Sequence, residues 1–181
     1  GNNTAIGKDA GQYVSTSTGS VFVGAYAGEG TDGSGLTGTG HTLVGYAAGQ
    51  KLEGDATQNT FVGNSAGQLT TAGDNNVFLG KDAGRTNTTG HSSIIIGVNA
   101  GEDWTGVNAA ADGTMGGNIF IGHNAAMNVT VMDGNTFIGY DAADAMTTGI
   151  SNTSVGYNTL TSATTNGSNA AGMPTGNTAI G

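Results

Sequence analysis

An aliphatic run closed by glycine recurs along the whole chain at a nearly constant spacing. The steps between successive closing glycines are, by subtraction, 17, 21, 18, 17, 17, 25, 17, 17 and 25 residues. Seventeen is therefore the base period, and the longer steps contain insertions. A short fixed period of this kind is the sequence signature of stacked repeats that share one continuous core. The closing glycines are Gly7, Gly24, Gly45, Gly63, Gly80, Gly97, Gly122, Gly139, Gly156 and Gly181.

Each repeat has the same order of residue types. The position before the glycine is always aliphatic, the one before that contains every Phe of the chain, and Thr, Val or Ile and then Asn, Ser or His precede it. Such a β-branched run predicts a short strand. The glycine and the small or Asx residues after it permit a sharp corner. A helix is disfavoured, because glycine every few residues costs about 1 kcal/mol each in a helix interior.

These features predict an all-β fold in which each repeat is one coil of a parallel β-solenoid or β-roll, with a base coil of 17 residues and loop insertions. Coils about 4.8 Å apart would form a rod about 43 Å long over nine steps. We expect a single domain of about nine coils over residues 1–181. Because the sequence starts and stops inside the motif, with "GNNTAIG" and "GNTAIG", we also expect a segment of a longer fibre.

Both faces of the predicted strand are apolar, which indicates association of several rods. Side chains alternate across a strand, so the Phe column faces one way and the aliphatic column faces the other. One column must line the coil, and the other would lie exposed as an interface-sized patch. We expect a homo-oligomer with the Phe column at its axis, and with the aliphatic column there as the alternative. The expected interface or core ladder is Phe22, Phe61, Phe78, Phe120, Phe137, Ile96, Ile121 and Ile138.

The motif also resembles a known family. "NTAIGKDAG" and its variants "NTFVGNSAG" and "NNVFLGKDAG" are similar to the "NSVAIGxxAxA" head repeats of trimeric autotransporter adhesins and to repeats of phage tail fibres. The resemblance implies a left-handed β-roll, three chains in one shaft, and attachment to host surfaces. The present coil is longer than the adhesin repeat, and Phe stands where that repeat has mainly Ala.

Charge and composition narrow the classes of partner. The chain has 13 acidic and 4 basic residues, a formal net charge of −9, so little in it could neutralise nucleic-acid phosphates or an anionic membrane. It has no Cys and no apolar stretch of membrane-spanning length. We therefore expect no nucleic-acid partner and no membrane insertion. The resemblance to adhesin and tail-fibre repeats implies a place outside the cell, at a cell surface or on a virion tail.

Catalytic and cofactor chemistry is not indicated. Asx residues recur two positions after the closing glycine, for example Asp9, Asp82 and Asn99. Such a ladder could hold Ca²⁺, but Asx also tolerates the corner conformation, and that interpretation is favoured. His41, His91 and His123 lack metal-ligand spacing and are expected at the surface or at corners. No "GxSxG" motif occurs, so we expect no catalytic residue, no cofactor, no metal and no enzyme.

The insertions are the expected contact loops, because extra residues in a solenoid bulge out on one side. Residues 98–117 carry the only Trp and residues 157–176 the only Pro. Trp104 is either a contact anchor for a host protein, a glycan or a neighbouring subunit, or a cover for an apolar patch of its own rod. Tyr46, Tyr140 and Tyr157 share one position and predict an outer aromatic row. The contact-loop candidates are Trp104, Asp112, Met115 and Met173.

The function most consistent with these patterns is a non-enzymatic structural or adhesive segment of an extracellular fibre, such as an adhesin head or a phage tail-fibre shaft. A subunit of a filament that grows end to end is the alternative, because exposed coil edges offer free hydrogen-bonding groups. An ice-binding rod is a third hypothesis. The Thr column that it needs is interrupted by Val21, Val77, Ile94 and Ile119.

Overall fold

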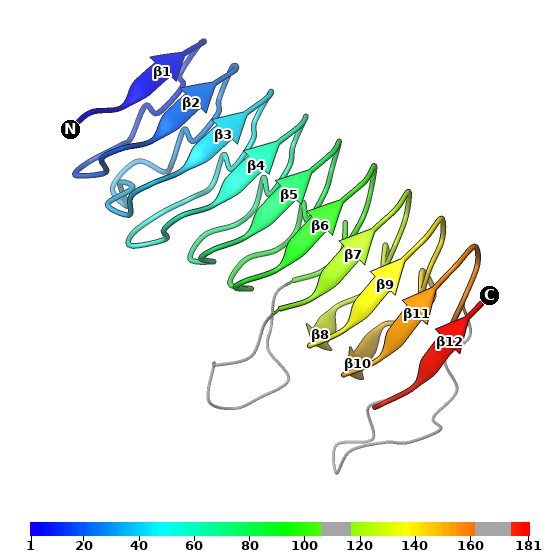
Figure 1. The fold of residues 1–181 in the computed structure, drawn as a ribbon. Coiled ribbons are helices and arrows are strands. Elements are labelled where there is room, and N and C mark those ends of the chain that lie inside the picture. Colours follow the sequence, from blue (N-terminus) through cyan, green and yellow to red (C-terminus); the bar gives the residue numbers. More distant parts are fainter. Residues whose placement is uncertain (106–116, 162–174) are drawn as a thin grey trace.

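The chain forms a stack of coils, a parallel β-solenoid, in a computed structural model that describes residues 1–105, 117–161 and 175–181. Within these ranges twelve three-residue strands form two sheets (Figure 1). The main sheet has ten strands in the order β1-β2-β3-β4-β5-β6-β7-β9-β11-β12, and the second sheet pairs β10 with β8. All these pairs are parallel, as the repeat predicts. The strands of the main sheet are β1 (Thr4–Ile6), β2 (Val21–Val23), β3 (Thr42–Val44), β4 (Thr60–Val62), β5 (Val77–Leu79), β6 (Ile94–Ile96), β7 (Ile119–Ile121), β9 (Thr136–Ile138), β11 (Thr153–Val155) and β12 (Thr178–Ile180); the others are β8 (Val131–Asp133) and β10 (Thr148–Ile150).

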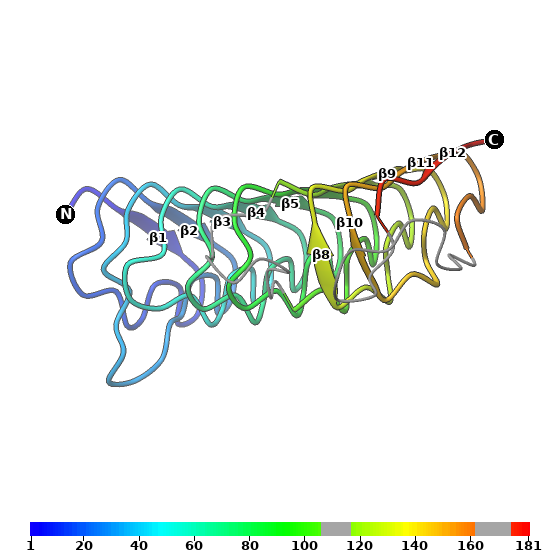
Figure 2. The ribbon, with the colours of Figure 1, turned by 90° about the horizontal axis from the view of Figure 1, so that it is seen from below.

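The register of the main sheet places like residues over like. Phe61 pairs with Phe78, and Phe120 pairs with Phe137. The same alignment holds across the insertion between β6 and β7, where Ile95 pairs with Phe120. Seen along its side, the rod is a single row of coils with a loop protruding near its N-terminal end (Figure 2). The strands therefore keep their register across the insertions.

The Phe column lines the interior of the coils, so its expected place at an oligomer axis is wrong. All five Phe side chains are at most 1% exposed within one chain. Rings stack along the rod, with centroids 4.6 Å apart for Phe61 and Phe78 and 5.4 Å apart for Phe120 and Phe137. The Phe rings fit inside the coil because the buried Ala and Gly residues on the opposite arm leave room for a large ring. A Cβ added at Gly67 would come within 2.5 Å of the Phe61 ring.

A second buried column is polar and ties the coils together. It lies four residues before each closing glycine, and its side-chain oxygens accept the backbone N–H of the next coil. Asn59 Oδ1 accepts from Asn76 N at 3.0 Å, and Asn135 Oδ1 accepts from Asn152 N at 2.9 Å. The same amides cross the coil, since Asn135 Nδ2 donates to Gly149 O at 2.9 Å. The column satisfies polar groups that burial would otherwise leave unpaired. Its members are Asn3, Ser20, His41, Asn59, Asn76, Ser93, Asn118, Asn135, Asn152 and Asn177, and we call it the asparagine ladder.

Replacing one amide of the asparagine ladder should destabilise the rod. Asn135→Ala removes the acceptor of Asn152 N and the donor to Gly149 O, and each buried group left unpaired costs about 1–3 kcal/mol. We expect urea denaturation to show a loss of about 2–4 kcal/mol in the free energy of unfolding. Asn128→Ala is the matched control, because exposed Asn128 makes one hydrogen bond to Asp144 O, and its loss should cost less than about 1 kcal/mol. Equal losses in the two variants would contradict a stabilising role of the ladder.

The Asx residues after the closing glycines serve the corner conformation. Asp9, Asp82 and Asn99 have φ angles of 53°, 55° and 56°, in the left-handed region. Asp and Asn tolerate this region better than most residues. Tyr26, Ala47 and Ser65 hold the same position with the same conformation. The favoured interpretation of the Asx column, as a corner residue, is therefore confirmed.

Candidate interaction surface

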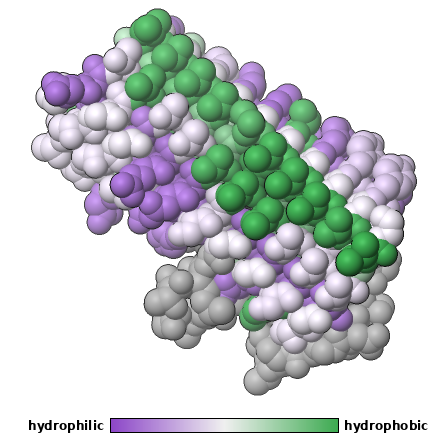
Figure 3. Space-filling view, in the orientation of Figure 1, coloured by the Kyte–Doolittle hydropathy of each residue, from purple (hydrophilic) through white to green (hydrophobic). Residues whose placement is uncertain are grey.

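The outward side of the main sheet carries a continuous apolar stripe. On strands β2–β7, β9 and β11 the first and third residues point away from the core, while the middle residue is buried, as in Val77-Phe78-Leu79. Val77 is 37%, Leu79 45% and Ile94 39% exposed. Figure 3 shows the stripe in green, following the strands along the rod. We call these outward positions the outer stripe; they comprise Thr4, Ile6, Val21, Val23, Thr42, Val44, Thr60, Val62, Val77, Leu79, Ile94, Ile96, Ile119, Ile121, Thr136, Ile138, Thr153, Val155, Thr178 and Ile180.

The outer stripe is uncharged, narrow and straight. Its positions are all Thr, Val, Ile or Leu. Ten strands about 4.8 Å apart and two outward residues per strand give a face about 45 Å long and about 10 Å wide, so about 450 Å². An area of about 450 Å² is in the range of the largest apolar patch on a typical monomer, about 300–600 Å², and such patches are often functional. Ile96, Ile121 and Ile138, expected in an interface or core ladder, lie on this stripe and are half-buried.

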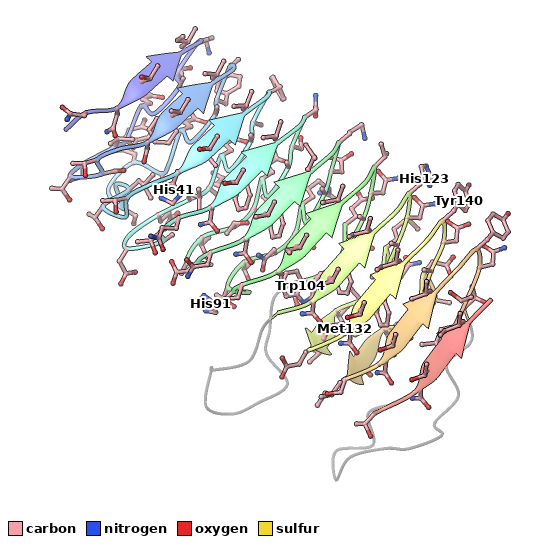
Figure 4. The ribbon with its side chains drawn as sticks, in the orientation of Figure 1. His41, His91, Trp104, His123, Met132 and Tyr140 are labelled. Atoms are coloured by element: carbon pink, nitrogen blue, oxygen red, sulfur yellow. The ribbon has the colours of Figure 1, made fainter. Side chains whose placement is uncertain are left out.

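An aromatic row flanks the stripe at the corner that follows the strands. The rings of His123 and Tyr140 stack with centroids 4.9 Å apart, and those of Tyr140 and Tyr157 lie 5.4 Å apart. Tyr140 and Tyr157 are 45% and 69% exposed. His123 and Tyr140 project from this corner in Figure 4. The outer aromatic row is thus confirmed for these two tyrosines, and it stacks with His123, whereas Tyr46 makes an edge contact with Tyr26.

The same corner is charged near the N-terminal end. Lys8 Nζ donates to Asp9 Oδ2 at 2.8 Å and to Tyr26 Oη at 2.6 Å, and it lies 4.5 Å from the centre of the Tyr26 ring. The hydrogen bond to Asp9, and then the one to Tyr26, raise the pKa of Lys8 above its ordinary value. Lys81 likewise bonds Asp82. This corner therefore carries ion pairs after β1 and β5 and stacked aromatic rings after β7, β9 and β11.

Trp104 is part of the core, so its role as an external contact anchor is wrong. Its side chain is 0% exposed, and its ring meets that of Phe120 edge-on at 6.1 Å. A Cβ at Gly90 would come within 2.3 Å of the Trp104 ring. The indole thus fills space that the glycine of the preceding coil leaves open (Figure 4). The other contact-loop candidates, Asp112, Met115 and Met173, lie outside the described residues.

The histidines differ in environment, and a surface position is wrong for one of them. His41 follows Gly40 at a corner of the coil, but it is 1% exposed and belongs to the asparagine ladder; Figure 4 labels it beside the strands near the N-terminal end. The sequence signal was its position, four residues before Gly45, in a column otherwise filled by Asn and Ser. His91 is half-buried beside Asp74, with His91 Nδ1 3.5 Å from Asp74 Oδ2, and His123 is exposed.

One open groove lies between the protruding loop and the next coils. Its volume is about 590 Å³, and hydroxyl groups, glycines and two carboxylates line it. Glu53 Oε1 already accepts a hydrogen bond from Thr31 Oγ1 at 2.6 Å. Within residues 1–105, 117–161 and 175–181, no three His, Cys, Asp or Glu side chains are grouped to hold a metal ion. In the same ranges no helix is long and apolar enough to cross a membrane.

The described surface thus offers one extended feature with the character of an interface, the outer stripe with its aromatic flank. Comparison of the chain with protein-family profiles, with curated proteins and with solved structures finds no match.

Proposed function

We propose that this chain is a non-enzymatic rod segment of an extracellular fibre, and that copies of it associate through the outer stripe. The observation that carries the proposal is the exposed, uncharged stripe on a rod whose interior is already filled. A filled core leaves the stripe free to serve contacts between molecules. The sequence resemblance to adhesin heads and tail fibres supports the extracellular setting and the attachment role, with a host-surface protein or glycan as the target.

The partner that fits the stripe best is another copy of the same rod. Two copies have the same coil spacing, so their Val, Ile and Leu side chains can interdigitate over the whole length. A pair sharing the stripe would bury about 900 Å² in total, just below the range of about 1,000–1,200 Å² at which specific interfaces begin. The flanking Tyr140 and Tyr157 add aromatic area at the edge. A trimer, in which each stripe contacts two others, uses the same face.

The test places a charge on the stripe. Leu79→Asp adds a carboxylate at a 45% exposed position, so it should leave the fold intact and separate the copies. Sedimentation velocity should show the unaltered chain as a discrete small oligomer and Leu79→Asp as a monomer, with a dissociation constant raised at least about 100-fold. Ala72→Asp is the matched control, because Ala72 is exposed on another arm of the coil.

Four outcomes would contradict the proposal. An unaltered chain that is monomeric at all concentrations, or a Leu79→Asp variant that stays oligomeric, would remove the stripe as an interface between copies. Open-ended growth that survives Leu79→Asp would favour the end-to-end filament. Thermal hysteresis abolished by Leu79→Asp in a monomeric chain would instead favour ice binding through the same face.

A further inference from the structure

The asparagine ladder contains one member that can change its charge near neutral pH. Asn and Ser side chains do not titrate, whereas an unperturbed imidazole titrates at about pH 6.5. His41 follows Ser20 and precedes Asn59 in the ladder, at the junction between β3 and β4. Its side chain is enclosed, at 1% exposure.

Both ring nitrogens of His41 are committed to hydrogen bonds. Nε2 lies 2.9 Å from Ala56 O, and a carbonyl oxygen only accepts, so Nε2 carries the proton. Nδ1 accepts the backbone N–H of Asn59 at 3.4 Å, the same bond that asparagine oxygens accept elsewhere in the ladder. The neutral imidazole with its proton on Nε2 is therefore the form that the coil junction requires.

Protonation of His41 would break this arrangement. Nδ1–H would face Asn59 N–H, so two donors would oppose each other, and a positive charge would lie in the core. Burial lowers the pKa of His41, and the hydrogen bond to Ala56 O and the negative charge of Asp74 offset only part of this effect.

The other titratable groups at this junction do not remove the effect. Asp74 is held by Thr57, whose N and Oγ1 donate to Asp74 Oδ1 at 2.6 Å and 3.2 Å. His91 lies on the far side of Asp74, and its Nδ1 accepts from Asp74 N at 3.1 Å. Asp55, next to Ala56, is exposed to solvent.

We propose that His41 is an acid-sensitive break point in the rod, at which the junction between β3 and β4 opens in mildly acidic solution while the asparagine junctions stay closed. The sign follows from proton linkage. The open state binds the proton more readily than the closed state, so the closed junction is fully stable above pH 6.5 and loses stability as the pH falls below that value. Acid would thus divide the rod at one defined place.

Amide hydrogen exchange, corrected for intrinsic rates, tests this directly. The amide of Asn59 should become more exposed by up to about tenfold per pH unit below 6.5, since one proton is taken up on opening. The amide of Asn152, which bonds Asn135 Oδ1, should keep its protection and serves as the internal reference. In His41→Asn, which installs the residue usual for the ladder, the Asn59 amide should lose its acid sensitivity. His91→Gln is the matched control and should retain it.

Two results would overturn the proposal. Equal acid sensitivity of Asn59 in the His41→Asn and unaltered chains would show that another group opens the junction. An NMR titration of the unaltered chain in which His41 gains its proton at or above pH 6.5 would show that the closed junction accommodates the charge. This titration needs no variant, so the proposal stays testable if a substitution prevents folding.

Discussion

Phe78→Ala should lower the free energy of unfolding by about 3–5 kcal/mol, the usual effect of removing a buried aromatic side chain. Phe78 is fully buried and stacks on Phe61 with nearly parallel rings. The neighbouring coils cannot close over the cavity, because their backbones are fixed by the continuous ladder of β4, β5 and β6. Urea denaturation of dilute protein, followed by circular dichroism, measures the change.

Leu79→Ala is the matched control for Phe78→Ala. Leu79 is the next residue of the same strand, but it points outward and is 45% exposed. Its truncation should cost less than about 1 kcal/mol in the monomer, because surface substitutions have small effects. A larger loss for Leu79→Ala than for Phe78→Ala would reverse the assignment of the two faces, and with it the proposed interface.

Gly97→Ala should lower the free energy of unfolding about as much as Phe78→Ala does, although it adds only one methyl group. Gly97 has a φ angle of 137°, and its new Cβ would come within 2.3 Å of Gly122 O on the next coil. A backbone conformation reserved for glycine costs about 1–3 kcal/mol, and forcing apart packed backbone costs about as much again. We expect a loss of more than about 3 kcal/mol in the free energy of unfolding, measured by urea denaturation.

Gly134→Ala separates the cost of the backbone conformation from the cost of the steric clash. Gly134 has a φ angle of 60°, and its new Cβ would meet a single atom, Ser151 Oγ, at 3.7 Å. Only the left-handed backbone penalty of about 1–2 kcal/mol remains there. If Gly97→Ala proved as mild as Gly134→Ala, the coils would not be in the close backbone contact that the closing glycines provide.

The fold could be predicted from the sequence because one repeat determines the strand, the corner and the stacking of the coils together. The spacing of the closing glycines predicted the coil, and the strands pair in that register even across the insertions. Which face of the strand points inward could not be predicted from the sequence. The Phe column and the Ile/Val column are both apolar, so the alternation of side chains is compatible with either column inside the coil. The deciding fact was the volume opposite the strand: Ala27, Ala48 and Ala66 leave room for a ring and not for a second layer of large side chains.

Trp104 and His41 differ from expectation for one reason. Their residue types suggested exposure, but the position that each holds within the repeat is one at which other coils bury a side chain. Trp104 belongs to a repeat with an insertion, which suggested an exposed loop, but it comes before the inserted residues. It stands three residues after a corner glycine, which is also the position of the buried Leu52. His41 was expected at the surface or at a corner, and its place in the Asn column, at a corner but buried, was not recognised. That column, recognised in the sequence without a role, proved to be the asparagine ladder. Contacts that cross from one arm of a coil to the other were needed to see this.

The direction of the backbone hydrogen bonds has a mechanical consequence. Bonds between coils run along the rod, for example from Gly63 N to Val44 O and from Gly80 N to Val62 O. A pull on the two ends therefore loads these bonds in tension, one coil at a time, and does not shear many strands together. Each released 17-residue coil would lengthen the chain by about 50 Å, against the 4.8 Å that it spans when wound. Under load such a rod would unfold in discrete steps, one coil at a time, and lengthen at each step. A tether built from it would therefore dissipate a sudden force before its attachment broke.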